Sequence, residues 1–137
     1  MSDKVYQVLF ICTDNSARSI MAEGLMDQLG AGRFKLCRAV QELRAGLYDA
    51  DLGGGLVKKR VARPGQGKSG GYRTLLATNK GVRWVFVFGF PKSARTNIDK
   101  DEEAALKKLA NHLLGLTPQG IAKAVAVEEL KEIHCHA

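Results

Sequence analysis

The stretch KKRVARPGQGKSGGYRTLLATNKGVRWVFVFGFPKSAR, residues 58–95, determines how this chain is interpreted. Val57, Lys59 and Val61 occupy every second position and alternate with the basic neighbours Lys58 and Arg60, which is the period of a β-strand. Residues 72–78 and 82–90 are rich in β-branched and aromatic residues and are separated by a short polar turn that contains glycine. A glycine-rich loop connects the first two of these segments. The stretch therefore predicts three consecutive antiparallel strands.

The same stretch carries ten basic side chains and no carboxylate. Residues 1–35 hold four basic and four acidic groups, residues 36–99 hold twelve and four, and residues 100–137 hold five and six. The middle of the chain thus accounts for the net charge of +7. Such a one-sided block of cations indicates a polyanionic partner, because binding to phosphates releases their counterions. We expect binding that weakens steeply with salt.

The length of 137 residues and the 45% hydrophobic content suit one globular domain covering residues 1–137. The N-terminus lacks the pattern of a signal peptide, and no apolar run is long enough for a membrane span, which predicts a cytoplasmic protein with no membrane partner. Cys12, Cys37 and Cys135 are odd in number and far apart, which favours reduced thiols. Neither a metal nor another cofactor is indicated.

Other segments predict one further strand and several helices. Residues 6–12 form a continuous apolar run of strand length, and the three- and four-residue spacing of apolar residues after it predicts a helix from Ile20 to Leu29 that stops at Gly30-Ala31-Gly32. The same spacing predicts a second helix over residues 36–47. The expected fold is therefore α+β: a compact sheet of three antiparallel strands plus an N-terminal strand, with helices packed on it.

The last third of the chain carries two signals for helix starts. Asp99 with Glu102 three residues later predicts a capping box for a helix that runs to Gly115. Thr117 and Pro118 predict the start of a shorter helix, and the shape of residues 128–134 is left open.

Several side chains of the strand region are expected to be structural. Phe86, Phe88 and Phe90 occur at period two and are expected to share one buried face with Trp84. Lys80 and Arg83 flank a turn and are expected to be solvated.

The loop between residues 12 and 19 could bind an oxyanion. Backbone N–H groups at a helix start and Arg18 would hold the anion, and the same field would make Cys12 a nucleophile. Residues 5–35 resemble the opening of low-molecular-weight tyrosine phosphatases and arsenate reductases. The resemblance implies Cys12 as nucleophile, Arg18 as anion clamp, Ser19 as the hydroxyl that lowers the thiol pKa and Asn15 as loop brace. The families' later general acid and paired cysteines are missing, so a role as scaffold alone stays open.

From Leu36 onward the chain resembles RelE/HigB-like toxins of bacterial toxin–antitoxin modules. The resemblance rests on DADLGGG, RPGQGKSGGYR, FVFGFPKS and a helix capped after NID, all in the same order. It implies a compact sheet with helices on it and cleavage of messenger RNA on the ribosome. It also implies a cognate antitoxin as partner, with DNA reached only through the antitoxin complex.

Cleavage of RNA by its own 2′-hydroxyl needs a base, an acid and cations, and no metal is essential. The basic segment has no His, Asp or Glu, so a lysine or a tyrosine must act as base. The catalytic candidates are Arg63, Lys68, Tyr72, Arg73, Lys92 and Arg95. Lys58 and Arg60 share one strand face and are the candidates for RNA binding, whereas Lys59 and Val61 point to the other face.

Three hypotheses follow. The chain is a ribosome-dependent endoribonuclease toxin, or a phosphatase or arsenate reductase acting through Cys12 and Arg18, or a catalytically inactive protein that only binds an antitoxin or RNA. A topoisomerase target, as in related gyrase-inhibiting toxins, is also open. In each case the strand over residues 6–12 is expected to pair with the toxin-like sheet, because a segment of 35 residues cannot build a core alone.

Overall fold

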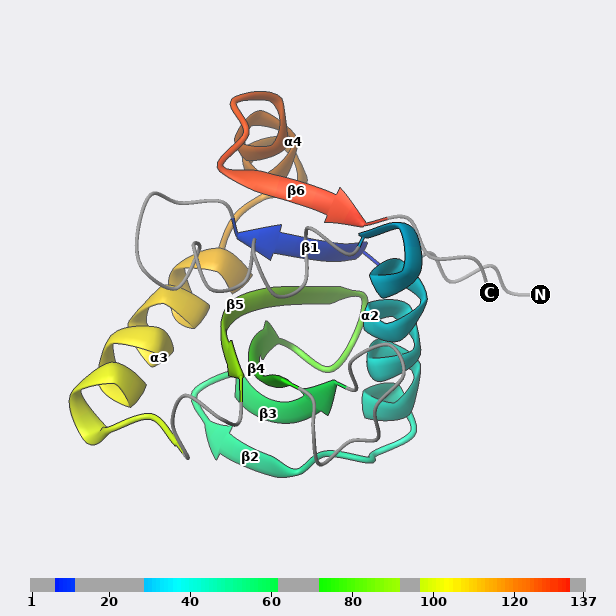
Figure 1. Cartoon of the computed structure of the whole chain (residues 1–137). Coiled ribbons are helices and arrows are strands. Elements are labelled where there is room, and N and C mark those ends of the chain that lie inside the picture. Colours follow the sequence, from blue (N-terminus) through cyan, green and yellow to red (C-terminus); the bar gives the residue numbers. More distant parts are fainter. Residues whose placement is uncertain (1–6, 12–28, 62–71, 92–96, 134–137) are drawn as a thin grey trace.

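The computed structural model describes residues 7–11, 29–61, 72–91 and 97–133. Its centre is a mixed sheet of six strands in the order β2-β3-β4-β5-β1-β6 (Figure 1). The strands are β1 (Gln7–Ile11), β2 (Ala50–Gly53), β3 (Leu56–Val61), β4 (Tyr72–Thr78), β5 (Arg83–Pro91) and β6 (Leu130–Ile133). The helices are α2 (Leu29–Arg44), α3 (Lys100–Leu114) and α4 (Pro118–Ala126). The predicted α+β class is confirmed.

The three predicted antiparallel strands are β3, β4 and β5, which pair in sequence order. The N-terminal strand also joins the sheet as predicted: β1 runs parallel to β5, with Val8 beside Trp84. The prediction of four strands was wrong in number. It missed β2, which pairs with β3, and β6, which pairs antiparallel with β1. Both strands have four residues and no clear alternation of apolar side chains, so only their backbone pairing identifies them.

Helix α2 begins earlier than predicted. The sequence suggested a stop at Gly30 and Gly32, but α2 starts at Leu29 and continues through both glycines to Arg44. The buried residues Leu36, Val40 and Leu43 pack this helix against the sheet. Burial of such a stripe outweighs the cost of about 1 kcal/mol that each interior glycine imposes. The helix predicted from Ile20 to Leu29 lies almost wholly outside the described residues.

Helix α3 begins at the predicted capping box. The Asp99 carboxylate accepts from Glu102 N at 2.8 Å, and Asp99 N donates to the Glu102 carboxylate at 3.0 Å. At the other end of α3, Arg83 donates to the carbonyls of Leu113 and Leu116 at 3.0 and 2.7 Å. Leu113 is in the last turn of α3 and Leu116 follows the helix, so neither carbonyl accepts the i→i−4 bond of a helix interior, although Leu113 O also accepts weakly from Leu116 N at 3.4 Å. Arg83 is therefore a structural cap and not the solvated turn residue expected.

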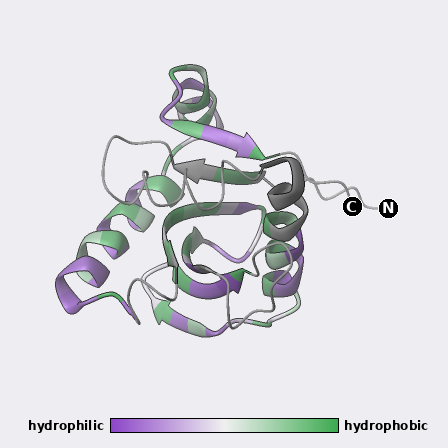
Figure 2. Ribbon diagram, viewed as in Figure 1, coloured by the Kyte–Doolittle hydropathy of each residue, from purple (hydrophilic) through white to green (hydrophobic). Residues whose placement is uncertain are grey.

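Helices cover both faces of the sheet, and each face has its own core (Figure 1). On one face α2 packs on a cluster that includes Val57, Val61 and Trp84. On the other face α3 and α4 pack on a cluster that includes Leu75 and Phe90. Figure 2 shows hydrophobic and hydrophilic residues in alternating bands along α3, as expected for a helix that packs one side on a sheet. The sheet is therefore the middle layer of three.

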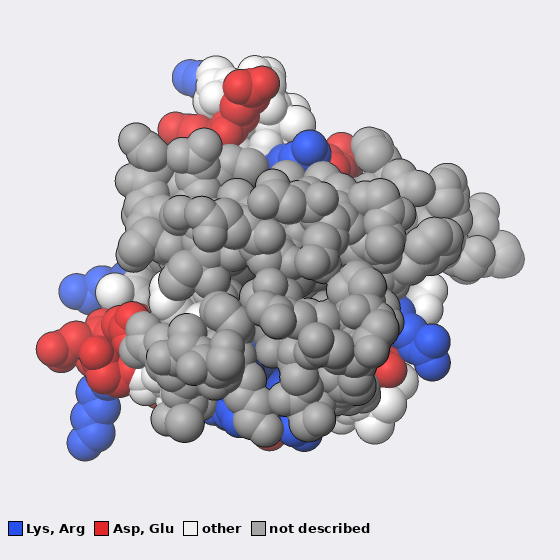
Figure 3. All heavy atoms as spheres, in the orientation of Figure 1, with Lys and Arg blue, Asp and Glu red and all other residues white. Residues whose placement is uncertain are grey.

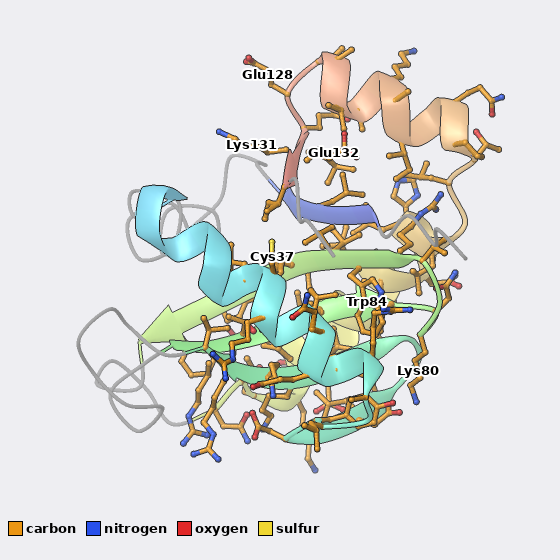
Figure 4. The ribbon with its side chains drawn as sticks, turned by 90° about the vertical axis from the view of Figure 1, so that its right-hand side faces the viewer. Cys37, Lys80, Trp84, Glu128, Lys131 and Glu132 are labelled. Carbon is orange, nitrogen blue, oxygen red and sulfur yellow. The ribbon has the colours of Figure 1, made fainter. Side chains whose placement is uncertain are left out.

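A bulge in β5 separates the aromatic residues that were expected on one face. Leu75 pairs with Phe88 but Leu76 pairs with Phe86, so Val87 is an extra residue. This insertion reverses the alternation. Trp84 and Phe86 belong to the core under α2, as Figure 4 shows for Trp84, whereas Phe88 and Phe90 belong to the core under α3. All four are buried as expected, but not together.

Cys37 on α2 is disulfide-bonded, contrary to the expectation of reduced thiols. The other two cysteines of the chain, Cys12 and Cys135, lie outside the described residues. Each helix in the described part is too short or too polar to cross a lipid bilayer.

Candidate functional site

Strand β3 presents its basic residues to both faces of the sheet. Val57 and Val61 pack in the core under α2, and Leu56 packs in the core under α3. Because side chains alternate along a strand, Lys59 lies on the α2 face, and Lys58 and Arg60 lie on the α3 face. The predicted division of these residues is confirmed.

Lys59 is a structural residue. Its side chain is 6% exposed, and its Nζ lies 2.7 Å from a carboxylate oxygen of Glu42 on α2. The same Nζ donates to the carbonyl of Leu47 at 3.0 Å. A buried ammonium with both an anionic and a neutral acceptor is satisfied within the protein. Lys59 therefore fastens the end of α2 to β3 and is not available to a ligand.

Three cations meet on the opposite face. Arg60 stands directly across from Arg73 of β4, and Lys58 stands across from Leu75. Arg73 is itself paired with Phe90 of β5. Directly opposed residues project to the same side of a sheet, so Lys58, Arg60 and Arg73 form one group, which we call the cationic face. Like charges directly opposite repel each other, and an anion between them would remove that cost.

The three cations differ in their partners within the chain. The Arg60 Nε lies 3.5 Å from a carboxylate oxygen of Asp49, and Arg60 N donates to the other oxygen at 2.6 Å. Lys58 Nζ donates instead to the side-chain oxygen of Asn97 at 3.1 Å. Arg60 is thus partly neutralised, whereas Lys58 is oriented by an uncharged acceptor.

Arg73 has an unsatisfied donor. Its Nε is buried and makes no hydrogen bond within the described part of the chain. A buried guanidinium donor without an acceptor costs free energy, of the order of 1–3 kcal/mol. A phosphate or carboxylate oxygen could relieve that cost with a charge-assisted bond if it displaced the atoms that cover this nitrogen. The cationic face therefore has the chemistry of an anion-binding site.

The described structure accounts for only some of the predicted site residues. Of Tyr72 only the backbone is described, at the start of β4. The other catalytic candidates, Arg63, Lys68, Lys92 and Arg95, lie outside the described residues, as do Cys12, Asn15, Arg18 and Ser19 of the predicted oxyanion loop. Asp49 and Asn97 were missed by the sequence analysis. The signals for Asn97 were its place two residues before the predicted N-cap of α3 and its presence in the NID motif of the toxin resemblance.

Lys80, which was expected to be solvated, has structural partners away from the cationic face. Lys80 in the β4–β5 turn pairs with Asp51 of β2, and its Nζ lies 5.1 Å from the centre of the Tyr48 ring. The hydrogen bond from Lys80 lowers the pKa of Asp51, with a smaller contribution from Gly53 N, and it raises the pKa of Lys80. Figure 4 shows Lys80 well separated from Lys131. Lys80 is thus not simply solvated, as was expected, but ties the turn to β2.

Acidic side chains occupy the start of α3, beside the cationic face. Its first turn holds Asp101, Glu102 and Glu103, and Lys107 pairs with Glu103 at 3.0 Å. Figure 3 shows these acidic groups gathered over α3, with basic side chains visible separately towards β2 and β3. Carboxylates near a helix N-terminus are favourable because they complement its dipole.

Comparison with known families identifies the chain. The model described as "RelE toxin of RelE / RelB toxin-antitoxin system" matches residues 26–133. The chain belongs to the RelE toxin family. No curated protein matches it at a significant level. The RelE match covers β2 to β6 and all three described helices, so it includes the whole cationic face.

Membership in the RelE family has two direct consequences. The chain is the toxin of a toxin–antitoxin pair, so its cognate partner is an antitoxin of RelB type. RelE toxins are generally ribonucleases, which supports an enzymatic role. The match already includes residues 26–35, which had been compared with phosphatases, and the resemblance to those enzymes gains no support.

Proposed function

We propose that this RelE toxin is a metal-independent, ribosome-dependent endonuclease that cuts messenger RNA and so inhibits translation. The observation that carries the proposal is the cationic face, on which Lys58, Arg60 and the unsatisfied Arg73 converge. The chain's family supports a ribonuclease, and the chemistry of the face suits a phosphate.

The proposed reaction is an internal transfer at one phosphodiester. The 2′-oxygen attacks phosphorus and loses its proton to a base, while the bond from phosphorus to the 5′-oxygen breaks and that oxygen takes a proton from an acid. The products are a 2′,3′-cyclic phosphate and a 5′-hydroxyl. In the transition state, negative charge accumulates on the non-bridging phosphate oxygens, and fixed cations stabilise this charge.

Roles for the side chains follow from their chemistry. Arg73 and Arg60 cannot lose a proton at neutral pH, so they stabilise charge. The proton transfers fall to lysines or to Tyr72, with Lys68 and Lys92 as the lysine candidates. Arg63 and Arg95 add further charge stabilisation, and Lys58 holds the RNA backbone. A messenger RNA target implies action in the cytoplasm, and DNA is contacted only through the antitoxin complex.

The test compares Arg73→Met with wild type after induced expression in a bacterium that lacks the antitoxin. Wild type should stop growth and translation, and messenger RNA should be cut at the ribosomal A site. Arg73→Met should reduce cleavage by purified toxin on ribosomes by about 10²–10³-fold, the usual cost of removing one group that stabilises transition-state charge. The variant should unfold at no lower temperature, because it loses a repulsion and an unsatisfied donor.

Lys131→Met is the matched control. Lys131 is exposed on β6, which is the edge strand farthest from β2 and β3 in the sheet. Its substitution by methionine removes one positive charge, as Arg73→Met does. It should retain wild-type cleavage. Growth arrest without messenger RNA cleavage would point to another target, and antitoxin binding without growth arrest would show an inactive toxin. Either result would contradict the proposal.

A further inference from the structure

Asn97 lies beside Lys58, two residues before the N-cap of α3. Its side-chain oxygen accepts from Lys58 Nζ at 3.1 Å and from Ile98 N at 2.9 Å. Both donors need an acceptor, and in an asparagine side chain only the oxygen can accept. The orientation of the amide is thereby fixed, and it fixes the place of the Lys58 ammonium on the cationic face.

The backbone that carries Asn97 is itself held in place. The reciprocal hydrogen bonds between Asp99 and Glu102 form a capping box at the first turn of α3. α3 in turn packs on the sheet through Leu106, Ala110 and Leu113. A side chain next to a packed helix with a capped first turn can hold a neighbouring group more precisely than a side chain on an unsupported loop can.

The acceptor at Lys58 differs in charge from the acceptor at Arg60. Asp49 places a carboxylate beside Arg60 and offsets part of its charge. Asn97 supplies an oxygen of similar geometry to Lys58 but no formal charge. An ammonium that donates to a neutral amide keeps its full positive charge. The attraction between Lys58 and a nearby phosphate would therefore not be weakened by Asn97.

We propose that Asn97 is a positioning residue, which orients the Lys58 ammonium toward the RNA backbone and leaves its charge unneutralised. The inference rests on the proposed function, because it assigns the oriented charge to RNA. The competing explanation is mechanical: the bond between Lys58 and Asn97 only attaches α3 to β3. An aspartate would perform that mechanical task at least as well, so the substitution Asn97→Asp separates the two explanations.

The experiment measures the affinity of the full chain for ribosomes that carry a 2′-O-methylated messenger RNA, which cannot be cleaved, over a series of salt concentrations. Asn97→Asp should bind about threefold more weakly at low salt, with a slope of log affinity against log salt that is smaller by about 0.7, the value for one lost single-strand phosphate contact. Lys58→Met should show the same loss. The double variant should bind no more weakly than Lys58→Met alone.

A second readout excludes unfolding as the cause. Asn97→Asp adds a carboxylate near the N-terminus of α3 and beside an ammonium, so its unfolding temperature should equal or exceed that of wild type. Binding and stability should thus change in opposite directions. A purely structural bond would move both in the same direction or leave binding unchanged.

Asn79→Asp is the charge-matched control. The Asn79 side-chain oxygen accepts from Gly81 N at 2.9 Å, and an aspartate oxygen could accept the same bond. Asn79 follows the C-terminal end of β4, whereas Arg73 lies near the N-terminal end of that strand. It should bind ribosomes as wild type does. Two results would overturn this inference alone. One is an equal loss of ribosome affinity in Asn79→Asp and Asn97→Asp. The other is wild-type affinity in Asn97→Asp together with weakened binding by Lys58→Met. Unchanged binding and cleavage in both Lys58→Met and Arg73→Met would overturn the proposed function instead.

Discussion

Lys59 and its two basic neighbours lie on opposite faces of the sheet although the three residues are consecutive in one strand. Lys59 is buried under α2 and paired with Glu42, whereas Lys58 and Arg60 lie on the other face together with Arg73. Lys58 and Lys59 are the same residue type, so the residue type does not decide which of the two is paired with a carboxylate inside the protein. The difference comes from the strand period, which turns successive side chains to faces that different helices cover.

The two faces also differ in how completely their charges are satisfied. On the α2 face, the Lys59 ammonium has two acceptors within the protein. On the cationic face, counting partners from the described residues alone, Arg73 Nε has none and Lys58 has one acceptor, which is uncharged. The α2 face thus compensates its charge within the protein, and the cationic face does so less completely.

The largest expected effect tests the structural side of this comparison. Lys59→Ala should lower the free energy of unfolding by about 3 kcal/mol, because it removes the buried cation of Glu42 and leaves this carboxylate with the exposed Arg38 at 3.8 Å. This is the lower end of the range for such pairs, since 24% of the Glu42 side chain remains exposed. Urea unfolding followed by circular dichroism measures the change.

Lys58→Ala is the control for that measurement, because it removes the same side chain from the neighbouring position. Its hydrogen bond to Asn97 is exposed, so the free energy of unfolding should fall by less than about 1 kcal/mol. Equal destabilisation by both substitutions would show that the two faces do not differ as described.

An intermediate effect is expected from Asp49→Asn, which tests the cationic face. The amide can still accept the hydrogen bond from Arg60 N, but it no longer offsets the Arg60 charge. If the face binds RNA, affinity for ribosomes with uncleavable messenger RNA should rise about threefold at low salt, and the salt slope should steepen by about 0.7. Unchanged binding would mean that Arg60 does not contact phosphate.

The smallest effect concerns Asp51 and Lys80, which lie away from the cationic face. The hydrogen bond from Lys80 lowers the pKa of Asp51 below its ordinary value of 3.8. Asp51 therefore contributes stability that is present above about pH 3.8 and is lost as the pH falls through its lowered folded-state pKa. In Lys80→Ala the Asp51 pKa should return towards 3.8, which a carbon-detected NMR titration measures.

Salt provides the check on that interpretation. The pair is exposed, so 1 M salt should remove most of the difference in Asp51 pKa between wild type and Lys80→Ala. RNA cleavage at neutral pH should be the same in both proteins. A loss of cleavage in Lys80→Ala would extend the functional surface to the β4–β5 turn.

Elements with a strong periodic or capping signal could be predicted from the sequence. The central strands, the start of α3 at Asp99 and the start of α4 after Thr117 are as expected. The short edge strands were missed because four residues carry too little pattern. The N-terminal limit of α2 was misplaced because local glycine preference was outweighed by burial against the sheet.

The candidate site was only partly predictable for a related reason. Alternation assigned Lys58 and Arg60 to one face of β3, and the structure confirms this. Their acceptors could not be foreseen, because Asn97 is 39 residues from Lys58 and Asp49 is 11 from Arg60. Alternation also failed in β5, where the bulge at Val87 moves Trp84 and Phe86 to the face opposite Phe88 and Phe90.

The amino-acid sequence by itself determined the strand and helix types, the concentration of cations in residues 58–95 and the side of β3 to which each basic residue points, because these depend on local periodicity and composition. Only the tertiary structure decided which of those cations are neutralised. Charge pairing depends on which distant segments pack together, and that packing places Glu42 beside Lys59, a neutral amide beside Lys58, and no acceptor from the described residues beside Arg73 Nε.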